Sequence, residues 1–98
     1  MSYFAICTFD LKNASHADYQ TAYADLAQIG FSRKIRSSQG QEILLPTTTA
    51  AREFTGTSVG TVRDNLRERV RRAFAARRFT SEIVVSVGNN WCWGYDKT

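Results

Sequence analysis

The 98-residue sequence predicts a single α+β domain of the ferredoxin-like class, ordered strand, helix, strand, strand, helix, strand. Three observations lead to this prediction. The chain has the length of one domain, 43% of its residues are hydrophobic, and apolar strand-like runs alternate with two amphipathic segments. Each helix in this order joins two strands that run parallel, so both helices should cover one face of an antiparallel sheet.

The first strand and the first helix are predicted at residues 3–11 and 15–29. The strand is apolar almost throughout and rich in aromatic and branched residues, which is typical of a central strand. Ser15 can cap the helix, with Asp18 placed to complete a capping box, and Gly30 can adopt the left-handed conformation that ends it.

Strands two and three are predicted as a hairpin at residues 31–35 and 42–45, joined by the polar, glycine-containing link 37–41. Pro46 cannot donate a hydrogen bond to a strand ladder, so the third strand should lie at an edge or contain a bulge. The threonine run that follows retains strand propensity. We therefore expect this strand to continue unevenly to Phe54.

The second helix is predicted from Val59 to near Arg78, with an apolar stripe at helical spacing, and the fourth strand at residues 82–88. Residues 91–95 are aromatic and predict an extra C-terminal strand. The sheet face without helices needs a cover in so small a chain. We therefore expect a homodimer formed through the C-terminal segment, with these interface residues: Trp91, Trp93 and Tyr95.

The sequence contains no run long and apolar enough to span a membrane, and its start lacks the basic and apolar regions of a signal peptide. These features predict a cytoplasmic protein that does not enter membranes. Cys7 and Cys92 are too few for a disulfide framework and have no partners at zinc-ligand spacing. Both are interpreted as packing thiols.

Positive charge is concentrated in the second predicted helix. The formal net charge of the chain is +4, and residues 63–78 alone contain seven arginines against two acids. A broad surface of arginines suits phosphate oxygens and would bind RNA or DNA in a salt-dependent way. The alternative is an ordinary solvated helix face, because Asp64 and Glu68 are within reach of these arginines. The candidate nucleic-acid-binding residues are Arg63, Arg67, Arg69, Arg71 and Arg72.

Asp10 is the candidate catalytic residue, because it ends the predicted central strand, where loops converge. One interpretation is a turn cap in which its carboxylate accepts hydrogen bonds from the amides of Lys12 or Asn13. The other is that two copies of Asp10 in a dimer hold one divalent metal, Mg²⁺ or Mn²⁺, since hard oxygen ligands suit these ions.

A chain of this length and order whose first strand ends in Phe9-Asp10-Leu11 resembles the small ferredoxin-like ribonucleases of the CRISPR-adaptation and VapD type. It is also similar in size to the GhoS-type antitoxins. The resemblance implies a dimer, C-terminal strands that embrace across it, and a metal-dependent phosphodiesterase with Asp10 as the metal ligand. Only Asp10 carries over residue by residue.

Two function classes follow from the sequence. The first is a nucleic-acid-binding protein, which would be a metal-dependent endoribonuclease if it is catalytic. In this class Trp91 and Trp93 could also stack on bases. The second is a non-catalytic module that binds a protein partner through its dimer surface, such as an antitoxin or a phage-borne inhibitor. The single histidine, His16, lies in a capping segment without partners for a nucleophilic triad.

Overall fold

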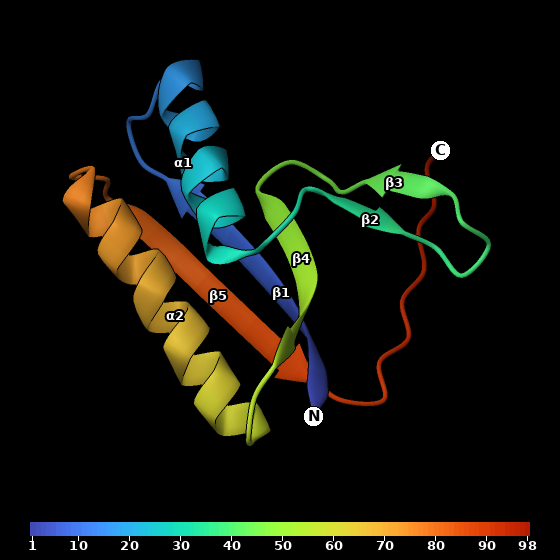
Figure 1. Ribbon diagram of the computed structural model, residues 1–98. Coiled ribbons are helices and arrows are strands. Elements are labelled where there is room, and N and C mark those ends of the chain that lie inside the picture. The colour runs from blue at the N-terminus through green and yellow to red at the C-terminus, as the bar shows by residue number, and fades with distance from the viewer.

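An antiparallel sheet of three strands carries two helices on one of its faces, and a separate two-stranded hairpin projects to one side (Figure 1). The computed structural model describes residues 1–98. In chain order the elements are β1 (Ser2–Leu11), α1 (His16–Ile29), β2 (Lys34–Arg36), β3 (Glu42–Leu44), β4 (Thr49–Thr55), α2 (Val59–Ala76) and β5 (Ser81–Gly88).

β1 is the central strand of the sheet, in the order β4-β1-β5, and it runs antiparallel to both neighbours. In register, Ile6 lies opposite Ala51 of β4 and Ser86 of β5. The strand predicted at residues 3–11 is thereby confirmed. Because β4 and β5 are both antiparallel to β1, they run parallel to each other, and α2 is the connection between them.

The ends of α1 are fixed by local side-chain chemistry. The Ser15 hydroxyl accepts a hydrogen bond from the Asp18 amide at 3.1 Å, and the Asp18 carboxylate accepts one from the Ser15 amide at 3.0 Å. Gly30 ends the helix in the left-handed region at φ 118°, where a Cβ atom would also meet the Phe54 ring at 3.0 Å. The predicted capping box and glycine stop are both confirmed.

α2 begins after Ser58, whose hydroxyl accepts a hydrogen bond from the Thr61 amide at 3.1 Å. Neither helix is long and apolar enough to cross a membrane. One stripe of α2 is buried against the sheet, which confirms the helical spacing seen in the sequence. The buried residues of this stripe are Val62, Leu66, Val70 and Phe74.

The hydrophobic core lies between the helices and one face of β1. Alternate residues of β1 point into it, because successive side chains of a strand face opposite sides. Phe9 makes an edge contact with Phe74 of α2, with ring centroids 5.3 Å apart, and Leu26 of α1 is 1% exposed. The five core residues from β1 are Tyr3, Ala5, Cys7, Phe9 and Leu11.

The prediction that the third strand continues unevenly to Phe54 is wrong, because the chain forms two strands, β3 and β4, on either side of Pro46. Pro46 has no amide hydrogen to donate, and Thr48 takes a left-handed φ of 64° before β4 begins. β2 and β3 therefore pair only with each other, and the hairpin meets the main sheet through the single bridge between Ser32 and Ala51. The main sheet has three strands instead of four.

The expected extra C-terminal strand is also wrong. Residues 89–98, hereafter the C-terminal segment, form no strand. Asn90 has a φ of 53°, a left-handed conformation that asparagine tolerates, and the chain changes direction there. The segment then passes beside the β2–β3 hairpin (Figure 1), where residues of both line one hollow. Trp91, instead of pairing as a strand residue, stacks on Phe4 of β1.

A matched pair of leucine variants tests this placement of the core. Leu26→Ala should lower the free energy of unfolding by about 2–5 kcal/mol, because it removes buried methyl groups and leaves a cavity. Leu44→Ala, at a position 54% exposed on the hairpin, should change it by less than about 0.5 kcal/mol. Urea unfolding followed by circular dichroism gives both values. Equal losses in the two variants would contradict the assigned core.

Candidate functional site

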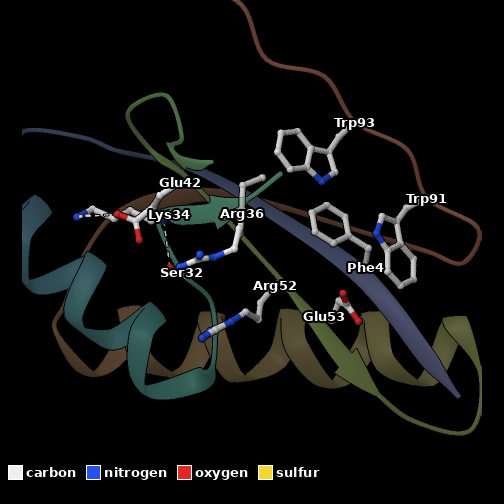
Figure 2. A pocket seen from close by; sticks show the side chains of 10 residues that line it. Phe4, Ser32, Lys34, Arg36, Glu42, Arg52, Glu53, Trp91 and Trp93 are labelled. Carbon is white, nitrogen blue, oxygen red and sulfur yellow. Dashed lines mark hydrogen bonds and ion pairs between the residues drawn. The ribbon is translucent and has the colours of Figure 1, made fainter. Parts of the chain in front are cut away.

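A groove lies on the face of the sheet that the helices leave uncovered. Its floor forms where the start of β1 pairs with the end of β4, and its walls are the β2–β3 hairpin and the C-terminal segment. The groove has a volume of about 690 Å³. Figure 2 shows Phe4, Trp91 and Trp93 on the side of the sheet opposite the helices. The groove is therefore separate from the hydrophobic core, which lies on the helical side of the sheet.

Three aromatic rings and the side chain of Ile35 form the apolar part of the groove. Phe4 and Trp91 are stacked, with ring centroids 5.7 Å apart and an angle of 22° between their planes. Trp91 remains 38% exposed, so the stacked pair is accessible from solvent. Trp93 lines the same groove farther along the C-terminal segment (Figure 2). Accessible, nearly parallel rings of this kind can accept another flat ring by stacking.

Positive side chains line the part of the groove away from these rings (Figure 2). Lys34 and Arg36 come from β2 and Arg52 from β4. The Lys34 ammonium pairs with the Glu42 carboxylate at 3.7 Å, and both side chains are more than half exposed. Neither Arg36 nor Arg52 has a carboxylate within 4.0 Å. The Arg36 guanidinium is thus available to an anionic ligand in the groove. Arg52 lies opposite the core residue Ala5 in register, so its side chain leaves the sheet on the helical side and borders the groove only at the sheet edge.

The remaining acid of the groove, Glu53, lies beside Phe4 in register. Its carboxylate accepts a hydrogen bond from the Ser2 hydroxyl at 3.0 Å. The groove lining therefore contains three cations and two acids, and each acid has a partner of its own within the chain. The balance of charge in the groove is positive.

The arginines of α2 lie on the other side of the molecule, in the helical layer, and most are paired. Asp64 accepts from Arg63 at 3.0 Å and lies 3.4 Å from Arg67. Glu68 contacts the other two paired arginines, at 2.6 Å and 2.9 Å. Hydrogen bonds from these guanidinium groups lower the pKa of Glu68 to about 2. The five candidate arginines were Arg63, Arg67, Arg69, Arg71 and Arg72, of which only Arg69 makes no ion pair.

Asp10 lies near the end of β1, on the same open face as the groove. Its carboxylate accepts a hydrogen bond from the Tyr19 hydroxyl of α1 at 3.2 Å. The turn-cap interpretation is wrong: Asp10 accepts no hydrogen bond from the Lys12 amide, which donates instead to the Thr80 carbonyl at 2.9 Å. Asp10 and Phe4 are six residues apart on one strand, which corresponds to about 20 Å. Asp10 is therefore at the opposite end of the open face from the groove.

The structure gathers few metal ligands around Asp10 in one chain. Glu82 of β5 lies opposite Asp10 in the sheet register, but no group of three or more histidine, cysteine, aspartate or glutamate side chains is gathered anywhere in the structure. Mg²⁺ is ordinarily bound by one or two carboxylates together with waters and phosphate oxygens. One chain therefore supplies at most part of such a site.

The structure brings together some of the residues predicted from sequence and separates others. Trp91 and Trp93 meet in the groove, and Tyr95 lines an adjoining hollow beside the hairpin loop. Asp10 and the α2 arginines are apart from them and from each other. Sequence reasoning missed the aromatic ring and the cations that the sheet and the hairpin contribute to the groove lining, because they lie in or next to predicted strands. The missed residues are Phe4, Lys34, Arg36 and Arg52.

No protein-family model matches the sequence, and no curated protein matches it at a significant level.

The Glu68 ion pairs predict a pH-dependent contribution to stability. The pKa of Glu68 is lowered from 4.5 to about 2 in the folded chain, so its ionised form stabilises the fold above about pH 4.5. This contribution should be lost as the pH falls towards 2. Glu68→Gln should therefore be less stable than the wild type at about pH 6, and the difference should shrink at about pH 2.5. Urea midpoints at both pH values measure it. A difference that does not change with pH would contradict the pairing.

Proposed function

We propose that the protein binds single-stranded nucleic acid in the groove on its open sheet face. The observation that carries this proposal is the accessible Phe4–Trp91 stack in a groove that also contains the Arg36 guanidinium, which has no carboxylate partner. Stacking platforms bordered by positive charge are the common means of binding single strands, because every base has a flat face and every nucleotide a phosphate. Bases in a duplex are already stacked on one another, so a single strand suits this groove better.

The fold itself supports the same proposal. β4, β1 and β5 have the order and directions of three strands of a ferredoxin-like sheet, and the Ser32–Ala51 bridge stands where the edge strand of that sheet would pair. We infer a ferredoxin-like topology whose second strand is reduced to this bridge. Sheets that present aromatic side chains on an open face stack two or three bases in other RNA-binding domains.

Binding of a labelled single-stranded oligonucleotide, RNA and DNA in parallel, tests the proposal by fluorescence anisotropy. Trp91→Ala should cost about 1–3 kcal/mol of binding free energy, because it removes a stacking surface. Arg36→Gln should weaken binding and reduce the slope of log affinity against log salt by about 1.

The control for this experiment has the same change of charge on the other layer. Arg67→Gln removes one arginine of α2 that is paired with Asp64. This variant should bind almost as the wild type does. A larger loss in the α2 variant than in the groove variant would move the binding surface to the arginines of the helix.

A second candidate function is binding to a protein, including a second copy of the chain, through the same face. The observation that favours it is exposed apolar surface beside the groove, where Ile6 is 39% and Val84 61% exposed. A contact of this kind is mainly apolar and should change little with salt, whereas nucleic-acid binding should weaken by orders of magnitude. Sedimentation at high concentration, with and without oligonucleotide, distinguishes the two functions.

The implied endoribonuclease activity is a separate proposal about Asp10. Since one chain supplies only part of a metal site, this activity requires a dimer that brings a second Asp10 close. It predicts cleavage of labelled RNA or DNA only with Mg²⁺ or Mn²⁺, abolished by Asp10→Asn. The amide can still accept the hydrogen bond from Tyr19, so the variant should fold. A dimer that binds RNA and DNA but cleaves neither, with or without these metals, would contradict the proposal.

A further inference from the structure

A second cavity, of about 420 Å³, lies between α1 and the loop that joins β3 to β4. It is lined on one side by His16, Tyr19 and Tyr23, and on the other by Thr47 and Thr48. None of these residues lines the groove described above. The cavity is therefore a separate feature of the molecule, and the proposed nucleic-acid binding does not account for it.

Arg33 supplies the charge of this cavity. Its guanidinium carbon lies 3.9 Å above the centre of the Tyr23 ring, a cation–π contact that holds the group in place. Arg33 forms no ion pair, and its Nε atom is buried with no hydrogen-bond partner. Buried polar groups in folded proteins are nearly always satisfied. The buried Nε is not reached from the cavity, but the uncompensated charge of a guanidinium group that lines the cavity favours an anionic ligand.

The walls of the cavity are held by hydrogen bonds. The Thr48 amide donates to the Tyr23 hydroxyl at 3.1 Å, and the Thr48 carbonyl accepts from the Phe9 amide at 3.1 Å. The loop is thus tied to both α1 and β1. Thr48 keeps its left-handed φ of 64° in this arrangement. The cavity is therefore formed before any ligand binds, which reduces the entropy lost on binding.

The other polar groups of the cavity are neutral or basic. Gln20 follows His16 by one helical turn, so the two side chains share a face of α1, and Thr47 adds a hydroxyl from the loop. No carboxylate lines the cavity. The nearest acid in the hydrogen-bond network is Asp10, which accepts from the Tyr19 hydroxyl at 3.2 Å. The lining therefore offers one cation and several donors without an acid to repel an anion.

We propose that this cavity binds the phosphate group of a phosphomonoester, with the Arg33 guanidinium as its principal partner. A guanidinium group can donate two parallel hydrogen bonds to phosphate oxygens, and the donors on α1 and the loop suit the remaining oxygens of a tetrahedral anion. A volume of about 420 Å³ exceeds that of a phosphate ion, so the cavity also has room for part of the group that carries the phosphate. The ligand is inorganic phosphate, a small phosphomonoester or the 5′-phosphate of a nucleic-acid strand.

Calorimetric titration with inorganic phosphate tests the proposal on the full chain. The wild type should show saturable binding. Arg33→Gln should weaken it at least about tenfold, as expected for loss of a charge-assisted bidentate contact. Because this change also removes the contact with Tyr23, a second variant leaves Arg33 in place. Gln20→Glu puts a negative charge into the cavity from an exposed position on α1 and should weaken binding at least as much.

Gln28→Glu is the matched control, because Gln28 is exposed on the same helix but does not line the cavity. It should bind phosphate as the wild type does. Trp91→Ala should also leave phosphate binding unchanged, which separates this site from the groove. No saturable phosphate binding by the wild type, or equal losses in Gln20→Glu and Gln28→Glu, would overturn the proposal.

Two oligonucleotides of the same sequence, one with a 5′-phosphate and one with a 5′-hydroxyl, distinguish the sources of the phosphate. Tighter binding of the phosphorylated strand, lost in Gln20→Glu but kept in Gln28→Glu, would identify a strand end as the ligand. Equal binding of the two strands, together with saturable binding of inorganic phosphate, would assign the cavity to free phosphate or a small phosphomonoester.

Discussion

The alternation of side chains along β1 is the constraint on which the rest of the structure depends. Cys7 and its alternate neighbours are buried against the helices, and burial raises the pKa of the Cys7 thiol to about 11. The residues between them point to the opposite face. Since both helices cover the first face, every apolar residue on the second face must be covered by the hairpin, by the C-terminal segment or by a ligand.

The chain meets this requirement only at one end of the sheet. There Trp91 covers Phe4, and the hairpin closes the side of the groove, whereas Ile6 and Val84 remain exposed farther along. The cations of the helical layer and those of the groove differ in whether they have acidic partners. The arginines of α2 are largely neutralised by acids on their own helix, while Arg36 in the groove has no carboxylate partner. The groove has fewer cations than α2, but Arg36 is more available to phosphate than the paired arginines are.

The sequence predicts those elements that local interactions determine. Ser15 and Asp18 cap α1 and Gly30 ends it because each acts on residues within one helical turn. The predictions of a third strand that continues to Phe54 and of a C-terminal strand were wrong, because strand propensity alone does not determine which strands pair. Pro46 lies between β3 and β4, and the β2–β3 hairpin forms a separate sheet. The groove could not be predicted for a related reason, since Phe4 and Trp91 meet from opposite ends of the chain.

Titration of the protein's own tryptophan fluorescence with a single-stranded oligonucleotide tests the central claim most directly. Both tryptophans, Trp91 and Trp93, lie in the C-terminal segment, so their emission reports on the groove and the hollows that adjoin it. Bases that stack on these indoles should quench the emission saturably, with an affinity that falls as salt rises. Binding that is detected by anisotropy but leaves the tryptophan emission unchanged would contradict the groove as the binding surface.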